Sequence, residues 1–198
     1  GYCVVDGQVF RCAGGVPHGE VDLAVALQKS CNGYFIRLGQ ELGPERVREM
    51  AVRLGFGRAL NLADTLSTAA GQLPEAETLT SSGAFANFCF GQGEMLATPI
   101  QIAAMMNPIA AGGIWREPLF LECTLDETTG ESLTALAHRG ARRVFSAQTA
   151  RALRELLASV VTEGTGHEAA PTEGTAAGKT GTAQTGQFAA GKELKNYW

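Results

Sequence analysis

Residues 178–184, with the sequence GKTGTAQ, combine a cation, two hydroxyl groups and an unhindered backbone in one short segment. Lys179 supplies a fixed positive charge, and the hydroxyls of Thr180 and Thr182 are donors for a carboxylate. Gly181 has no side chain and therefore allows a substrate backbone to lie against the chain. The N–H of Thr182 is a candidate donor to an oxyanion. Together these groups suit the binding of a carboxylate next to a carbonyl group under attack.

Two further candidate residues lie far upstream, in the tripeptide Ser30-Cys31-Asn32. Ser30 carries a short hydroxyl that can pass on a proton, and Asn32 offers a donor and an acceptor suited to a peptide amide. A glycine-rich tripeptide, Gly91-Gln92-Gly93, lies between the two motifs. In this order the motifs indicate part of a serine acyl-transfer site for peptides or β-lactams.

Each motif alone also has a simpler structural explanation. The Lys-Thr-Gly tripeptide is compatible with a polar strand followed by a turn, and Ser30 and Asn32 with capping residues at helix ends. The motif set also needs a Ser-x-x-Lys nucleophile, and no such tetrapeptide occurs in the 198 residues. No Gly-x-Ser-x-Gly motif replaces it.

Other nucleophiles and bases are less favoured. His18, His138 and His167 each lie in a polar, loop-like context and are predicted to be surface residues. Cys31 lies inside the Ser-x-Asn motif, but no neighbour in the sequence would activate it as a nucleophile. A thiol that faces the core is therefore the preferred interpretation for Cys31.

The composition fits one globular domain, or a large piece of one. The chain is 45% hydrophobic and 18% charged, with a net charge of −4 and no run of Lys or Arg, which argues against a nucleic-acid partner. Residues 95–115 carry no charge, but Pro99, Pro108 and Gly112-Gly113 interrupt them. A buried core helix is therefore preferred over a membrane span.

Five cysteines leave at least one thiol free or available for an intermolecular bridge. Cys3 and Cys12 flank Asp6-Gly7, a strong hairpin signal, so a cross-strand disulfide is possible there. Two small buried side chains are the simpler alternative. No Cys-x-x-Cys is present, so a zinc site is not expected. No other metal and no cofactor is predicted.

The order of predicted elements is rich in helices. Residues 2–12 are expected to form a hairpin, and residues 175–185, which carry Lys179, have β character. Residues 56–90 are expected to be irregular, and residues 117–145 to form two or three short strands. The predicted helices span residues 22–29, 33–42, 45–54, 98–111 and 146–161. Asp22 and Ser146 are the expected caps of the first and last of these helices, and Thr98-Pro99 opens the fourth.

The segments around these motifs resemble the transpeptidase domain of penicillin-binding proteins, most closely the class B, single-function enzymes. The resemblance extends over nearly the whole chain. It is carried by Pro17-His18-Gly19, residues 30–35 (SCNGYF), residues 54–57 (LGFG), residues 91–93 with 97–103 (GQG and ATPIQIA), and residues 178–184. It implies an α+β fold with an antiparallel sheet flanked by helices and a helical lobe.

The resemblance implies a D,D-transpeptidase that cross-links peptidoglycan stem peptides through a serine acyl-enzyme, and that β-lactams acylate. Ser30 then corresponds to the proton-relay serine and Asn32 to the asparagine that binds a peptide amide. Lys179, Thr180 and Thr182 correspond to the carboxylate-binding group, next to Gly181. Residues 91–93 correspond to a supporting loop with no assigned chemistry. The family works at the extracytoplasmic face of the bacterial cell membrane, which implies a membrane anchor outside these residues.

The chain also departs from the family pattern. The Ser-x-x-Lys helix and the last strands are expected to lie outside residues 1–198, which would then be a partial domain with an incomplete sheet and no activity of its own. Ala110-Ala111-Gly112-Gly113 stands where Ala-Asn-Gly-Gly is expected. The alternative is a natural non-catalytic relative that binds muropeptide or a cell-wall or division partner.

Overall fold

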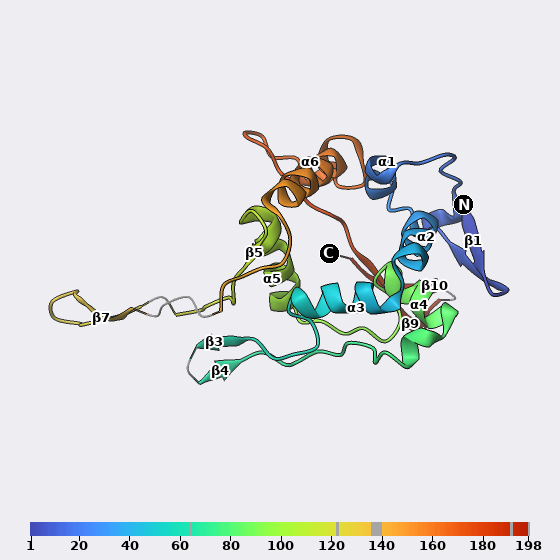
Figure 1. Cartoon of the computed structure of the whole chain (residues 1–198). Coiled ribbons are helices and arrows are strands. Elements are labelled where there is room, and N and C mark those ends of the chain that lie inside the picture. The colour runs from blue at the N-terminus through green and yellow to red at the C-terminus, as the bar shows by residue number, and fades with distance from the viewer. Residues whose placement is uncertain (64, 122, 136–139, 191, 198) are drawn as a thin grey trace. The chain divides into compact units, whose positions relative to one another are not determined.

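A computed structural model describes residues 1–63, 65–121, 123–135, 140–190 and 192–197. Figure 1 labels the helices and strands of the chain, which forms two compact units. Unit 1 contains Gly1–Val47, Pro74–Glu94 and Ala152–Trp198, and unit 2 contains Arg48–Leu73 and Met95–Arg151. All the residues of the Ser-x-Asn, Gly-Gln-Gly and Lys-Thr-Gly motifs belong to unit 1.

Unit 1 begins with the predicted hairpin, formed by β1 (Tyr2–Val5) and β2 (Gln8–Arg11). Both turn residues have positive φ, 45° at Asp6 and 82° at Gly7, as a two-residue type I′ turn requires. The carboxylate of Asp6 accepts a hydrogen bond from the hydroxyl of Ser82. The hairpin turn is thereby held against the start of helix α4 (Ser82–Cys89).

Helices α1 (Leu23–Gln28) and α2 (Asn32–Leu42) follow the hairpin. Asp22 caps α1 as predicted, because its side chain accepts from the N–H of Val25 at 2.9 Å. Helix α2 packs closely on α4 at Gly39, where a Cβ atom would lie 2.2 Å from Cys89 Sγ. This packing buries Val5, Phe10, Ile36 and Ala86 in one apolar cluster.

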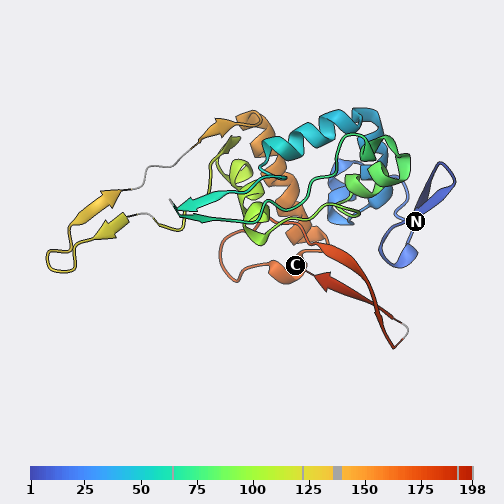
Figure 2. The same ribbon diagram turned by 90° about the horizontal axis from the view of Figure 1, so that it is seen from below.

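The last part of unit 1 contains the end of α6 (Ala147–Glu163), the short helix η3 (His167–Ala169), and strands β9 (Thr182–Ala189) and β10 (Lys192–Tyr197). The two strands form an antiparallel hairpin in which Thr182 lies opposite Tyr197, drawn in red in Figure 2. The Lys179 segment was predicted to be part of a strand. It instead precedes β9, which begins only at Thr182.

Unit 2 contains the end of α3 (Pro44–Arg53) and helix α5 (Pro99–Ala110). Its short strands are β3 (Asn61–Ala63), β4 (Leu66–Ser67), β5 (Ile114–Trp115), β6 (Cys123–Leu125), β7 (Ser132–Ala135) and β8 (Arg142–Arg143). Strand β8 pairs with β5. The core of unit 2 is formed by Leu60, Ala104, Trp115 and Val144. Thr98 and Gln101 form a capping box at the start of α5.

The predicted α+β fold is confirmed, and within the described residues the strands pair only two by two, as an incomplete sheet predicts. The uncharged segment forms α5, whose Gln101, Ala104 and Pro108 are buried. No helix in the described part of the chain has the length and apolar character needed to span a bilayer. The apolar run at residues 85–90 was predicted to be irregular, but it lies mostly in α4. A 3-10 helix, η2 (Thr78–Thr80), precedes it.

Candidate active site

Ser30 follows Lys29, the C-terminal cap of α1, and has a left-handed backbone conformation, with φ of 50°. Its N–H donates to Leu27 O at 3.2 Å, and the N–H of Cys31 donates to Ala26 O at 2.9 Å. These two bonds define a Schellman motif in which Ser30 occupies the position that glycine usually takes. A non-glycine residue in this conformation costs about 1–2 kcal/mol, which is the kind of strain that is concentrated at functional sites.

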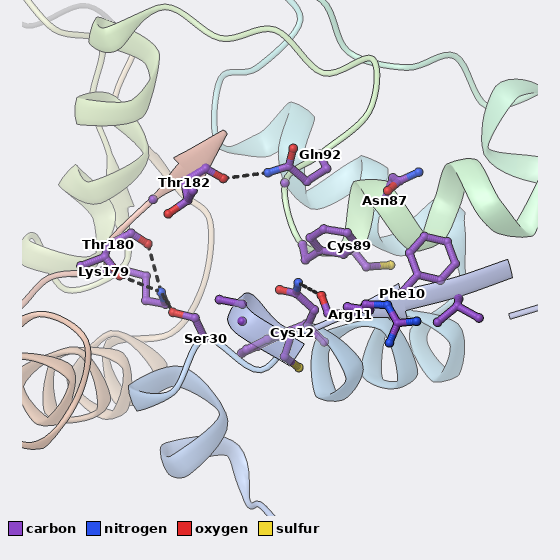
Figure 3. Close-up of a pocket in the computed structure, with 18 of the residues that line it drawn as sticks. Phe10, Arg11, Cys12, Ser30, Asn87, Cys89, Gln92, Lys179, Thr180 and Thr182 are labelled. Carbon is purple, nitrogen blue, oxygen red and sulfur yellow. Dashed lines mark hydrogen bonds between the residues drawn. The ribbon is translucent and has the colours of Figure 1, made fainter. Parts of the chain in front are cut away.

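Lys179 brings its ammonium group directly to Ser30 (Figure 3). Its Nζ donates to Ser30 Oγ at 2.5 Å and to Thr180 O at 3.0 Å. Burial lowers the pKa of Lys179 from its ordinary value, because a desolvated ammonium is disfavoured. The preceding residue is anchored to α6 by a bond from Gly178 N–H to Leu157 O at 3.1 Å.

Thr180 and Thr182 each contact a different loop. The hydroxyl of Thr180 lies 2.9 Å from that of Thr165, in the loop after α6. The side-chain amide of Gln92 donates to Thr182 O at 2.8 Å, so the Gly-Gln-Gly loop touches the start of β9 (Figure 3). This contact fits the prediction that the loop supports the cleft.

Asn32 is the first residue of α2, and its side-chain Nδ2 donates to the carbonyl of Arg11 at 2.9 Å. Arg11 is the last residue of β2, so the bond fixes Asn32 to the end of the hairpin. The hairpin was not predicted to be part of the site. The only available signal was that the Asp6-Gly7 turn places a strand at this point of the chain.

Ser30, Asn32 and Lys179 line one pocket of about 690 Å³, as a shared site requires. Arg11 and Lys179 are cationic, and no Asp or Glu occurs among the described residues that line the pocket, so the pocket favours an anionic ligand. The lining residues are Gln8, Val9, Phe10, Arg11, Cys12, Ala13, Gly14, Ser30, Asn32, Phe35, Asn87, Cys89, Phe90, Gly91, Gln92, Lys179, Thr180, Gly181 and Thr182.

The cysteines do not form the cross-strand disulfide between Cys3 and Cys12 that the sequence allowed. All five are free thiols, and Cys3 lies opposite Phe10 in the hairpin rather than opposite Cys12. Cys12 Sγ instead lies 3.9 Å from Cys31 Sγ. Both thiols are buried, and Cys31 therefore faces the core as predicted. The proposed Cys3–Cys12 disulfide is wrong for this structure.

The three histidines have different environments. His167 is exposed as predicted, with 68% of its side chain accessible. His18 was also predicted to be a surface residue, but its Nδ1 is fully buried and has no hydrogen-bond partner among the residues that the structure describes. His138 lies outside the described residues.

The pocket and the fold together match a known class of domain. The family model of the penicillin binding protein transpeptidase domain matches residues 7–198, and the chain therefore belongs to this family. The expected resemblance is confirmed.

Two curated relatives illustrate the similarity. Stage V sporulation protein D of Bacillus subtilis is 33% identical over 196 residues, which are 99% of this chain and 30% of that protein. Penicillin-binding protein PbpB of Mycolicibacterium smegmatis is 35% identical over 163 residues, which are 79% of this chain and 24% of that protein. The chain thus spans a third or less of the length of these relatives.

Solved structures give the same result for the fold. Penicillin binding protein 3 of Mycobacterium tuberculosis in complex with aztreonam superposes with a TM-score of 0.83 and 30% identity, over 98% of this chain and 44% of that one. The D,D-transpeptidase domain of a peptidoglycan glycosyltransferase from Eggerthella lenta also gives a TM-score of 0.83, with 26% identity over 93% of this chain and 47% of that one.

Proposed function

We propose that this chain supplies the carboxylate-binding and proton-relay half of a peptidoglycan D,D-transpeptidase site. The observation that carries the proposal is the contact of Lys179 Nζ with Ser30 Oγ in a pocket that Asn32 and Thr182 also line. The substrates are stem peptides ending in D-Ala-D-Ala, and β-lactams take their place in the same pocket. Relatives named as D,D-transpeptidases, such as PbpA of Mycolicibacterium smegmatis, favour this function over a non-catalytic role.

Each residue has a role in the proposed mechanism. Lys179, Thr180 and Thr182 bind the carboxylate of the donor peptide, and Gly181 leaves room for its backbone. Asn32 orients an amide of the peptide, and Ser30 relays a proton to or from the leaving group. The N–H of Thr182 stabilises the oxyanion of the tetrahedral intermediate. The serine of a Ser-x-x-Lys motif attacks the D-Ala-D-Ala peptide bond and forms an ester with the penultimate D-Ala, while the terminal D-Ala takes up a proton and leaves. An amine of a neighbouring stem peptide then attacks the ester, forms the cross-link and returns a proton to the serine.

The location follows from the substrate. Peptidoglycan is assembled outside the cytoplasmic membrane, so the proposal places the pocket on the extracytoplasmic face. The cationic lining and the neutral polar groups suit a peptide carboxylate. They offer no extended basic surface for nucleic acid.

The test is acylation by penicillin of a longer chain that includes the Ser-x-x-Lys segment, measured by intact-protein mass spectrometry. The extended protein is expected to gain one adduct per chain. Lys179→Ala should slow this acylation by about 10²–10³-fold, because a positioning and oxyanion-stabilising charge is lost. Lys29→Ala is the matched control, since Lys29 is exposed and does not line the pocket. Failure of the extended protein to form any adduct would overturn the assignment.

We further propose that residues 1–198 alone form no covalent adduct. An ester needs a nucleophile next to a base, and the printed sequence contains no Ser-x-x-Lys. The remaining groups are expected to bind penicillin reversibly and weakly, detected by ligand-observed NMR. A stoichiometric adduct on the short chain would contradict this proposal, and peptide mapping would then examine Ser30 and Cys31 first.

A further inference from the structure

Strand β2 borders the candidate pocket with four consecutive residues, Gln8–Arg11. The side chains of a strand alternate between its two faces, and here Phe10 is buried in the core whereas Val9 is 47% exposed. Neither face can therefore account for four neighbouring lining residues. The edge of β2 that is not paired with β1 borders the pocket, and the proposed mechanism gives this edge no role.

The register of the hairpin shows which backbone groups lie on that edge. In a hairpin with a two-residue turn, the flanking pair, here Val5 and Gln8, exchanges two ladder hydrogen bonds. Along an antiparallel ladder, such pairs alternate with pairs that exchange none. Val9 and Arg11 belong to the second kind of pair, so their N–H and C=O groups point away from β1.

Two observed contacts agree with this assignment. The carbonyl of Arg11 accepts from Asn32 Nδ2 at 2.9 Å, outside the hairpin, and the N–H of Cys12 continues the ladder by donating to Gly1 O at 3.0 Å. Within the described residues, nothing outside the hairpin is hydrogen-bonded to the N–H or the carbonyl of Val9, or to the N–H of Arg11. Three backbone groups of this edge are therefore available to a ligand.

One turn holds both this edge and the Lys179 segment. Lys179 Nζ donates to Ser30 Oγ, and Asn32, two residues further along, donates to Arg11 O. Figure 3 draws Ser30 between Lys179 and Arg11. Because two residues span at most about 7 Å, the edge of β2 and the ammonium group are attached to nearby points of the same turn.

A transpeptidase needs two peptides in one pocket, a donor that forms the ester and an acceptor that brings the amine. The proposed function places the carboxylate of the donor at Lys179. An extended peptide gains affinity from main-chain hydrogen bonds when it adds to a free strand edge. We infer that the free edge of β2 binds the acceptor stem peptide as an added strand, through Val9 and the N–H of Arg11.

The inference rests on the proposed function, because a second peptide is needed only for transfer. Strand β2 takes no part in the bond changes and holds the acceptor so that its amine can reach the ester. A free hairpin edge is often simply solvated. This edge differs because it borders the pocket and already accepts a hydrogen bond from Asn32, a motif residue.

The first test is peptide binding by the 198-residue chain, followed by NMR with labelled valine and arginine. The probe is an N-acetylated tripeptide amide, Ala-Lys-D-Ala, whose lysine supplies the amine and whose amide end brings no carboxylate to Lys179. At saturation, hydrogen exchange should slow at the N–H groups of Val9 and Arg11. It should not slow at Val4, which lies opposite Val9 and points to the other edge of the hairpin.

Methylation of the peptide tests the strand geometry without altering the protein. In an added strand only alternate N–H groups face β2. Methylation of one backbone nitrogen should therefore weaken binding by about three- to tenfold, and methylation of the next should have little effect. Equal effects at neighbouring nitrogens, or no slowing of exchange at Val9, would overturn the inference.

A matched pair of variants tests the role in transfer. Val9→Pro and Val4→Pro each remove one N–H that points away from the partner strand, but only that of Val9 borders the pocket. In the extended protein with its Ser-x-x-Lys segment, Val9→Pro should lower the ratio of aminolysis to hydrolysis of the acyl-enzyme by about three- to tenfold. Val4→Pro should leave this ratio unchanged, with folding of both variants checked by circular dichroism.

The outcomes separate this inference from the proposed function. If a D,D-peptide donor acylates the extended protein but both variants keep the normal ratio, the acceptor site is not on β2 and the proposed function stands. If no acyl-enzyme forms at all, the proposed function fails. The exchange measurement on the 198-residue chain then still decides whether β2 binds a peptide.

Discussion

Ser30 combines a strained backbone with a side chain that contacts Lys179, and these two features can be tested separately. Ser30→Gly and Ser30→Ala both remove the hydroxyl, but only glycine adopts a φ of 50° without strain. We expect Ser30→Gly to be more stable than Ser30→Ala by about 1 kcal/mol, measured by urea denaturation. In the extended protein both variants should acylate equally slowly, because each lacks the proton relay. Equal stability of the two variants would show that the Schellman geometry stores no strain.

Lys179 should make reversible penicillin binding depend on pH. Burial lowers the pKa of Lys179, so its ammonium loses the proton at a lower pH than an ordinary lysine. Binding of the penicillin carboxylate should therefore weaken as the pH rises through this lowered pKa. Lys179→Arg keeps its charge over the same range and should bind with little pH dependence. The comparison is a titration of the dissociation constant by ligand-observed NMR, and identical profiles would rule out Lys179 as the titrating group.

At the level of elements, the contact between α2 and α4 depends on a glycine. A Cβ at Gly39 would lie 2.2 Å from Cys89 Sγ, whereas one at Gly33, in the same helix, would lie 3.7 Å from its nearest neighbour. Gly39→Ala should destabilise the chain by about 1–3 kcal/mol through overpacking. Gly33→Ala is the matched control, and the double variant Gly39→Ala/Cys89→Ala should recover part of the loss. Equal effects of the two single variants on urea denaturation would contradict the packing argument.

The helices with explicit end signals were predictable from the sequence. Asp22, the Thr98-Pro99 pair and Ser146 all precede observed helices, and the Asp6-Gly7 turn forms the predicted hairpin. Helix α4 was missed because its residues are apolar and aromatic, without a polar face that would reveal a helical period. It is held in place by packing against α2 and the hairpin, which is a tertiary effect.

The site was predictable only where short motifs mark it. Lys179, Ser30 and Asn32 come together as the motif order suggested, although their roles stay predictions. Arg11 enters the pocket because β2 ends there, and a strand end carries no motif. The same limit hid the approach of Cys12 to Cys31, because the two residues are 19 positions apart in the sequence. Folding of the hairpin against α1 and α2 brings these residues together.

At the level of the whole molecule, the sign of the pocket's charge differs from that of the chain. The net charge is −4, whereas Arg11 and Lys179 line a pocket whose described lining residues include no Asp or Glu. The local field should decide the binding of an anion, because charges beyond about 10 Å are screened at 0.1 M salt. An anionic ligand is therefore expected to be attracted despite the negative chain.

The response of penicillin binding to salt distinguishes the field of the pocket cations from that of the net negative charge of the chain. If the cations of the pocket dominate, added salt screens an attraction, and the reversible affinity should fall by about two- to fivefold between 0.05 and 0.5 M NaCl. If the net charge dominated, salt would screen a repulsion and the affinity would rise. Penicillin methyl ester is the neutral control. It should bind about tenfold more weakly than penicillin, because it lacks the charge-assisted hydrogen bond of the carboxylate. Its affinity should respond little to salt. Ligand-observed NMR on the 198-residue chain measures all of these values. An affinity for penicillin that rises with salt would mean that Arg11 and Lys179 do not set the potential of the pocket.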